Sequence, residues 1–240
     1  MLTLKEIFDD LAYGEFSGMA VGNAKTQEGI TPDKYKKITN LVNAALLDLF
    51  TRFVFRKKEL DLHQKDGVTR YYLRASHVGD PLTGGDDIYL DGTKEDELNN
   101  DIIKILEAYD EDGNRVFIND HQYPDDIFMP EMDVIKLRDN GKRRIISLVY
   151  QASYPRIGVT SDFDPAAVRL DVPSTIKTAI MMHAASRLFT GKTSNVGEGQ
   201  RSMSSTFLYR YETECSRIRD LVLMPMEDTE VNAFNNRGFV

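Results

Sequence analysis

Hydrophobic and polar positions follow a helical period toward both ends of the chain. In three segments, apolar residues recur every three or four positions, which places them on one face of a helix. The first segment follows Thr31-Pro32, a residue pair typical of a helix start, and the third precedes Pro225, which we expect to end it. The helices predicted from this pattern are 32–58, 174–190 and 203–223.

A shorter helix is predicted at the N-terminus. Thr3 and Glu6 have the spacing of a capping box, in which each side chain bonds the backbone of the other residue. We expect the helix that follows to reach about Tyr13. Residues 14–29 contain four glycines and show no helical period, so they are expected to form a loop or an arm.

Between these helices the period changes to two, which is typical of strands. Turn sequences such as Lys65-Asp66-Gly67 and Asp139-Asn140-Gly141 separate the alternating stretches. We predict three hairpins, at 60–73, 102–118 and 134–150, a region of mostly loop at 79–100, and a last strand at 167–170. Because tight turns connect these strands, the sheet is expected to be antiparallel.

The expected fold class is therefore α+β. A long N-terminal helix and a C-terminal helical hairpin are expected to form a helical bundle, with an antiparallel β-rich insertion and an extended C-terminal tail. The predicted divisions are 1–30 for a short helix and arm, 31–58 with 172–224 for the helical bundle, 59–171 for the β-rich insertion, and 225–240 for the tail.

Composition excludes several classes of protein. The 12 Phe and 11 Tyr are too many for a chain that buries nothing, so the chain is not disordered throughout. No apolar run approaches the roughly 18–20 residues of a membrane span, and the N-terminus does not resemble a secretory signal. The single cysteine, Cys215, excludes an internal disulfide and a zinc cluster. A net charge of −8 argues against general binding to the phosphate backbone of nucleic acids.

Two short motifs imitate ligand-binding loops. Gly191-Lys192-Thr193 resembles the end of a phosphate-binding loop, but Ser186 stands where its first glycine is required. The spacing of Asp110, Asp112 and Asn114 imitates a calcium loop, but the glycine and glutamate that such a loop needs later are absent. We interpret the first as a helix end and the second as a hairpin turn.

The remaining candidates for chemistry are carboxylates, histidines and Cys215. His183 and Cys215 fall within predicted helices and are interpreted as packed side chains. No catalytic constellation emerges, so we expect no enzyme, no metal and no cofactor. The alternative is a metal-dependent hydrolase or nuclease that uses two acidic loops: Asp86, Asp87 and Asp91, and Asp125, Asp126, Glu131 and Asp133.

The last residues are polar but carry isolated aromatic side chains. A tail that cannot bury its own aromatic residues is a candidate for burying them on a partner, because aromatic anchors are enriched in interfaces. The predicted interface residues are Phe234, Asn236, Arg237, Phe239 and Val240.

The C-terminal third resembles a known family. From Val172 to Met224 the chain has a helix that begins at a proline, an alanine-rich turn, a glycine at the helix end, a polar loop and a long charged helix. This pattern resembles the helical hairpin of podovirus head-to-tail adaptor proteins, the tail tubular protein A-like group. The matching residues are Pro173, Ala184, Ala185, Ser186, Arg187, Phe189, Gly191, Tyr209, Arg210, Glu212, Glu214, Arg217 and Arg219.

The resemblance implies a structural virion protein rather than an enzyme. Such proteins form a ring, usually of twelve copies, that joins the portal protein to the tail hub and surrounds the DNA exit channel. The implied location is the neck of the virion, assembled in the cytoplasm of the host bacterium, with DNA passing through without specific binding. The tail would dock on the portal. Another neck or tail-completion protein is a further alternative.

Overall fold

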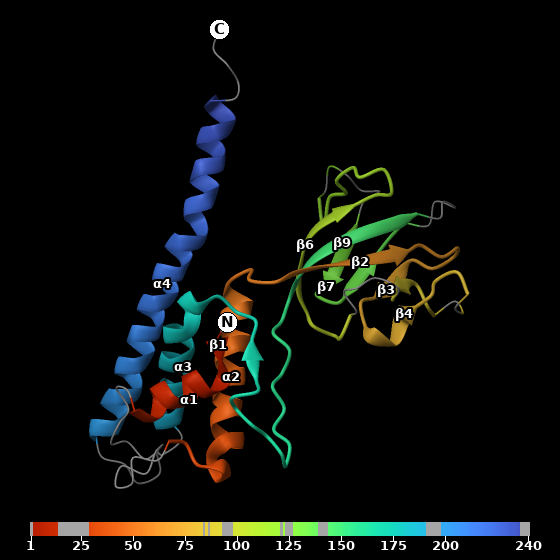
Figure 1. The fold of residues 1–240 in the computed structure, drawn as a ribbon. Helices are drawn as coiled ribbons and strands as arrows, with labels where there is room; N and C mark the ends of the chain where they lie inside the picture. Colours follow the sequence, from red (N-terminus) through yellow and green to blue (C-terminus); the bar gives the residue numbers. More distant parts are fainter. Residues whose placement is uncertain are drawn as a thin grey trace. The chain divides into compact units, whose positions relative to one another are not determined.

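The fold is α+β, as the sequence predicts. The computed structural model (Figure 1) describes residues 2–13, 29–83, 85, 87–92, 98–120, 122, 127–138, 144–190 and 198–235. For residues 190, 198–202 and 222–235 the backbone alone is described. The chain divides into two compact units. We call residues 1–49 with 156–240 the helical unit, and residues 50–155 the β unit.

Four helices account for most of the helical unit that the structure describes. The capping box is confirmed, because the backbone N–H of Glu6 donates to Thr3 Oγ1 at 3.3 Å and that of Thr3 donates to Glu6 Oε2 at 3.5 Å. The helices are α1 (Leu4–Tyr13), α2 (Pro32–Arg52), α3 (Lys177–Thr190) and α4 (Glu198–Asn235), and a short 3-10 turn (Ser174–Ile176) precedes α3.

Helix α2 begins at the predicted Pro32 but ends at Arg52, before the predicted end near residue 58. Lys57 and Lys58, which were predicted to end the helix, instead begin strand β2. The predicted apolar stripe is confirmed: Ile38, Val42 and Leu46 are all buried. The opposite face of α2 stays in contact with solvent at Lys36, as expected for an amphipathic helix.

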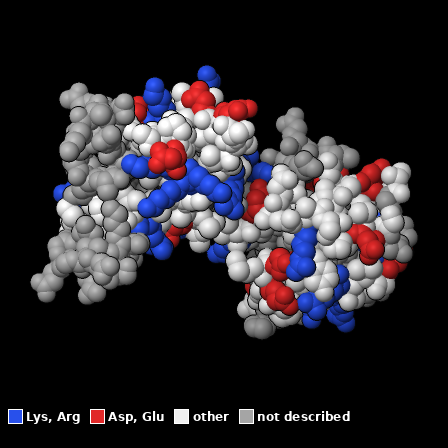
Figure 2. Space-filling model, turned by 90° about the horizontal axis from the view of Figure 1, so that it is seen from below, with Lys and Arg blue, Asp and Glu red and all other residues white. Residues whose placement is uncertain are grey.

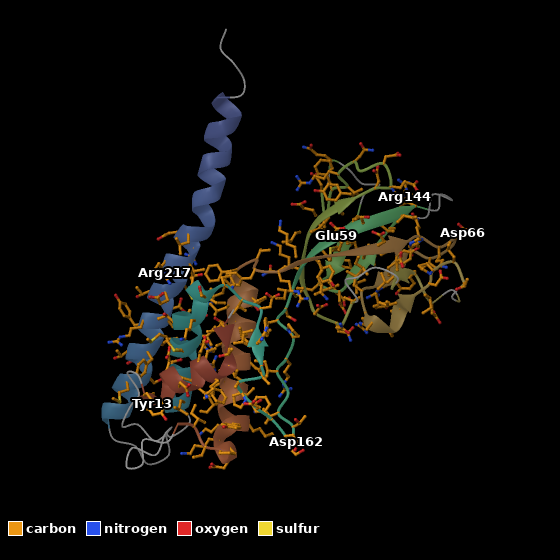
Figure 3. The ribbon with its side chains drawn as sticks, viewed as in Figure 1. Tyr13, Glu59, Asp66, Arg144, Asp162 and Arg217 are labelled. Atoms are coloured by element: carbon orange, nitrogen blue, oxygen red, sulfur yellow. The ribbon has the colours of Figure 1, made fainter. Side chains whose placement is uncertain are left out.

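Helices α3 and α4 pack against each other in opposite directions. Phe189 near the end of α3 stacks on Phe207 near the start of α4, with ring centroids 5.6 Å apart. At the other end, Arg217 of α4 donates to the backbone carbonyl of Thr175, which lies just before α3 (Figure 3). Every third or fourth residue of α4 from Phe207 onward is buried: Phe207, Tyr211, Cys215 and Ile218.

The prediction that Pro225 ends the last helix is wrong. Helix α4 has 38 residues and continues past Pro225 to Asn235 (Figure 1), so it is longer than the 21-residue α2. A proline inside a helix costs about 3 kcal/mol through a lost hydrogen bond and a steric clash. Glu227, Glu230 and Ala233 follow it and have high helix propensity, which favours continuation. The segment expected to be an extended tail is therefore helical as far as Asn235.

The last predicted strand lies in the helical unit and not in the β unit. Strand β10 (Arg169–Leu170) pairs antiparallel with β1 (Leu2–Thr3), so that Leu2 lies opposite Leu170. Both leucines are buried. The N-terminal strand thus fastens the segment that leads into α3.

The β unit contains two sheets. A five-stranded sheet has the order β4-β5-β2-β9-β6, and a three-stranded sheet has the order β3-β8-β7. Neighbouring strands are antiparallel except β4 and β5, which pair in parallel. The strands are β2 (Lys57–His63), β3 (Arg70–Tyr72), β4 (Val78–Gly79), β5 (Leu90–Asp91), β6 (Ile102–Tyr109), β7 (Phe128–Glu131), β8 (Val134–Lys136) and β9 (Ile145–Ala152).

Two of the three predicted hairpins are wrong. The turn at 65–67 forms, with Gly67 at a φ of 75°, but β2 pairs with β9 and β5 while β3 joins the other sheet. Likewise β8 and β9 belong to different sheets, and the predicted turn at 139–141 lies outside the described residues. The hairpin at 102–118 is confirmed by an antiparallel bridge between Tyr109 and Arg115.

The two sheets share one apolar core. Strand β9 supplies alternating buried residues such as Ile146, Leu148 and Tyr150, and β2 supplies Leu60 and Leu62. Short strands β4 and β5 lie in the region predicted to be mostly loop, where Leu90 is fully buried. The core therefore recruits residues that no local period identified.

Candidate interaction surfaces

The predicted interface residues fall at the very end of the chain. Phe234 lies in α4, of which the structure describes only the backbone there. Asn236, Arg237, Phe239 and Val240 lie outside the described residues. The role of these residues therefore stays a prediction.

Cys215 and His183 lie in a buried cluster centred on Tyr211. The Tyr211 hydroxyl donates a hydrogen bond to the carboxylate of Asp48 on α2, and the ring of His183 meets that of Tyr211 edge-on at 5.0 Å. Burial, and then the bond to Asp48, raise the pKa of Tyr211 far above its ordinary value. The tyrosine consequently stays protonated and acts as a donor between helices. The predictions that Cys215 and His183 are packed side chains are confirmed, since both are buried.

The calcium-like spacing at Asp110 forms a turn, as predicted. Asp110 Oδ1 accepts the backbone N–H groups of Asp112 at 3.0 Å and Asn114 at 2.7 Å, and Oδ2 accepts the Asn114 amide at 3.1 Å. These bonds, led by that of the Asn114 side chain, lower the pKa of Asp110. Gly113 takes a φ of 79°, which suits glycine. The Asp110 carboxylate therefore accepts hydrogen bonds from the residues of its own turn.

Two carboxylates of the predicted acidic loops are already paired with arginines. Glu131 pairs with Arg70 at 2.9 Å, and Asp133 pairs with Arg74 at 2.8 Å. Asp86, Asp125 and Asp126 lie outside the described residues. Within the described part of the chain, no three His, Cys, Asp or Glu side chains gather as metal ligands.

The phosphate-loop motif also lies outside the described residues, at 191–193. Ser186, which stands in place of the required glycine, is inside α3 and donates to the carbonyl of His183 at 2.8 Å. A glycine-rich loop that wraps phosphates therefore does not begin there.

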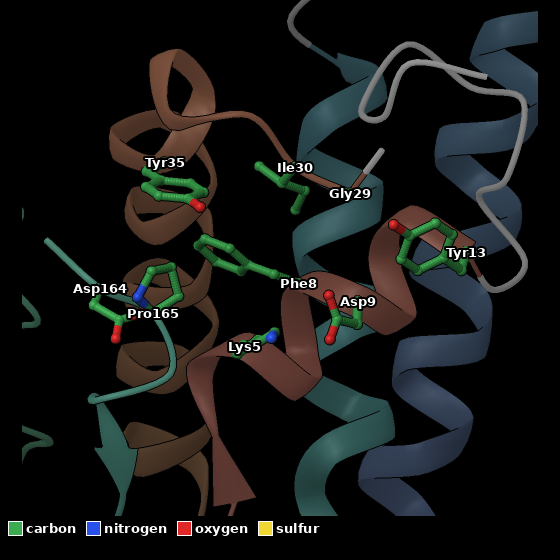
Figure 4. A pocket seen from close by; sticks show the side chains of 9 residues that line it. All are labelled: Lys5, Phe8, Asp9, Tyr13, Gly29, Ile30, Tyr35, Asp164 and Pro165. Carbon is green, nitrogen blue, oxygen red and sulfur yellow. The ribbon is translucent and has the colours of Figure 1, made fainter. Parts of the chain in front are cut away.

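A pocket of about 300 Å³ lies in the helical unit (Figure 4). The rings of Phe8 and Tyr35 form its apolar wall, with centroids 5.6 Å apart. Lys5 and Asp9 lie along α1 one helical turn apart, and both line the pocket. Their opposite charges are typical of a surface helix pair. The carboxylate of Asp164 also lines the pocket.

A larger and more apolar groove, of about 600 Å³, lies in the β unit. Two strands that end their respective sheets, β6 and β7, supply most of its walls. Its apolar lining includes Ile103, Ile105, Ile118, Met129 and Met132. Met132, at the turn between β7 and β8, is 70% exposed. A concave apolar surface of this size is typical of a binding site.

The helical unit carries an apolar surface of the opposite shape. Leu208 and Tyr209 point away from the α3 contact and are 48% and 75% exposed. Glu212 lies one turn further along the same side of α4 and is also exposed. We call Leu208, Tyr209 and Glu212 the α4 ridge, and the β6–β7 cavity the β groove. Neither the ridge nor the groove was predicted from the sequence. The ridge could have been, because Phe207 and Tyr211 lie on the buried face of the helix and Leu208 and Tyr209 therefore lie outside it.

Charge is mixed on the surface shown in Figure 2. Positive and negative side chains lie next to one another on this face of each unit, and a band of Lys and Arg side chains crosses the helical unit.

Comparison with known proteins gives no relative. No protein-family model matches the chain, and no curated protein matches it significantly. Among the helices that the structure describes, none has the length and apolar character needed to cross a membrane.

Proposed function

We propose that this chain is a structural head-to-tail adaptor of a podovirus-like phage. Copies of the chain would form a ring between the portal protein and the tail hub, closed at twelve as is usual in the family that the sequence resembles. The ring would surround the DNA exit channel without binding DNA specifically and would catalyse no reaction. Its place would be the neck of the virion, after assembly in the bacterial cytoplasm.

The observation that carries the proposal is the pairing of α3 with α4. Some of the residues that carry the resemblance contribute to this packing. Ala184 and Ala185 are both 1% exposed, and small side chains there let the two helices approach closely. Arg217 pairs with Glu214 at 2.8 Å and bonds the carbonyl of Thr175 at 3.0 Å.

The arrangement expected from the sequence is part of the proposal. Helices α2, α3 and α4 would form the bundle that carries the ring, consistent with the Asp48–Tyr211 hydrogen bond between α2 and α4. The β unit, residues 50–155, would form the insertion that the sequence predicts at 59–171. The end of α4 with residues 236–240 would dock on the portal. Ring closure requires that different faces of neighbouring copies meet.

The test is assembly on a portal. Purified chain mixed with portal rings from the same phage should give a stable complex in size-exclusion chromatography, and electron microscopy should show an added ring. A chain that remains separate from the portal at every ratio contradicts the proposal. If the chain instead cleaved nucleic acid or cell wall, and EDTA abolished this cleavage, the hydrolase alternative would replace it.

A further inference from the structure

Two exposed apolar surfaces lie on different units of the chain. The β groove is concave and lined by isoleucine and methionine side chains. The α4 ridge is convex and presents Leu208 and Tyr209 to solvent. A heterologous contact between copies needs two such different surfaces on every copy.

The edges of the β groove favour side chains over an added strand. The Asn119 side chain accepts the backbone N–H of Met129 at 2.7 Å and donates to its carbonyl at 3.2 Å, so it already occupies the edge of β7 there. Strand β6 departs from regular register twice, between residues 102 and 104 and between 105 and 107. Such irregularities and capped edges oppose strand addition. A helix that inserts side chains is the better occupant.

Charge selects which helix face fits. Lys104 lines the β groove and is exposed, whereas the acidic Glu131 beside it is paired with Arg70. Lys104 therefore supplies an exposed positive charge at the groove. On the α4 ridge, Glu212 supplies a carboxylate one turn from Leu208.

We propose that the α4 ridge of one copy docks in the β groove of the next. Leu208 and Tyr209 would fill the apolar floor, and Glu212 would approach Lys104. This contact rests on the proposed ring and names the surfaces that join its subunits. A ridge of two large side chains is far smaller than the interface of a stable dimer, so a single contact is weak and gains strength when the ring closes.

Site-specific cross-linking tests a weak contact directly. One full-length chain carries Met132→Cys, and another carries Thr213→Cys, an exposed position one turn beyond Tyr209 that leaves the ridge intact. The two chains are mixed and oxidised without portal. Native Cys215 is 2% exposed, and a Cys215→Ser background removes it altogether. We expect the Met132→Cys and Thr213→Cys chains to form a mixed disulfide dimer about tenfold faster than a control pair, because docking raises the local thiol concentration. The control replaces Met132→Cys by Leu82→Cys, which is 87% exposed elsewhere in the β unit.

Three outcomes overturn the proposal. The first is a rate equal to that of the Leu82→Cys control. The second is a monomeric cross-link in the double variant at high dilution, which would mean that ridge and groove meet within one chain. The third is faster homodimer formation by either single variant, which would indicate a symmetric contact.

Charge reversal gives an independent measurement. Lys104→Glu and Glu212→Lys should each slow the cross-link about fivefold, and the two together, on the partner chains, should restore it. Lys136→Glu on neighbouring β8 serves as the control. A double reversal that is no faster than the single ones contradicts the contact. Because no portal is present, these results are separate from the portal-binding test of the adaptor function.

Discussion

The Tyr211 hydroxyl on α4 donates a hydrogen bond to the carboxylate of Asp48 on α2, linking residues that are 163 positions apart in the chain. Tyr211 is fully buried. A hydrogen bond to a charged group contributes about 1.5–3 kcal/mol, and removing the donor leaves a desolvated carboxylate. This bond therefore ties an early helix to the last one.

Tyr211→Phe should destabilise the helical unit. The expected loss in the free energy of unfolding is about 2 kcal/mol, since the ring still fills its space and only the donor disappears. Urea unfolding followed by circular dichroism measures this loss. Tyr209→Phe is the matched control on the exposed side of α4 and should change little. Equal stabilities for the two variants would mean that the Asp48 bond is not important for folding.

The buried ion pair of the β unit should matter more than an exposed one. Lys58 Nζ lies 3.0 Å from Asp101, with the two side chains 6% and 13% exposed. Lys58→Met should cost about 3 kcal/mol because a charged carboxylate stays behind without this partner. Arg70→Met, which breaks the exposed pair with Glu131, should cost less than about 1 kcal/mol. Denaturant unfolding of both variants provides the comparison, and the reverse order would contradict it.

Asn119 should protect the edge of β7. Its backbone has a φ of 56°, so Asn119→Gly keeps that conformation and removes only the side-chain bonds to Met129. Amide hydrogen exchange at Met129 should become about fivefold faster, as expected from losing one hydrogen bond. Asn119→Ala adds strain and should also lower stability. Unchanged exchange in Asn119→Gly would show that something else shields this amide.

The turn at 110–114 should show a pH dependence of known sign. Because hydrogen bonds lower the pKa of Asp110 in the folded state, its contribution to stability is complete above the unfolded pKa. The contribution is then lost as the pH falls through the lower, folded value. Asn114→Ala removes the leading bond and should raise the pKa of Asp110 toward its ordinary range. Carboxyl chemical shifts followed by NMR during an acid titration would detect this, and an unmoved midpoint would contradict it.

Local signals in the sequence predicted the elements better than their partners. The Thr3–Glu6 capping box and the start of α2 at Pro32 depend on neighbours within one turn, and both are confirmed. The turn at Gly67 also forms, yet the strand after it leaves for another sheet. There the Tyr71 hydroxyl accepts the backbone N–H of Lys65 at 2.9 Å, so a buried side chain caps the turn. Strand pairing depends on such distant packing, which no local period contains.

The candidate surfaces follow the same rule. Tyr209 could have been identified, because it lies off the apolar stripe of its helix, and an exposed aromatic residue is unusual enough to examine. The β groove could not have been identified from the sequence, because Ile103, Ile118 and Met132 line one groove only after the two sheets have formed. A short turn between β7 and β8 places Met132 at the rim, and no hairpin was predicted there.

The final prediction concerns the end of α4, which extends to Asn235 and so allows two different truncations. A chain cut after Asn235 loses only residues 236–240 and keeps all of α4, whereas a chain cut after Pro225 loses helix as well. The two truncations therefore separate the aromatic anchor Phe239 from the helical segment that bears Phe234. Circular dichroism should be unchanged for the first truncation and should show less helix for the second.

Portal binding then decides which segment docks. If Phe239 and Arg237 anchor the chain, the first truncation should already weaken portal binding about tenfold or more, as removal of an aromatic anchor does in other interfaces. If Phe234 dominates, binding should persist in the first truncation and fail in the second, and Phe234→Ala in the full chain should reproduce that failure. Phe128→Ala is the control, because Phe128 is 53% exposed in the β unit and is not expected to meet the portal. Full binding by both truncations would mean that the end of the chain takes no part in docking, and that the portal recognises another surface of the helical unit.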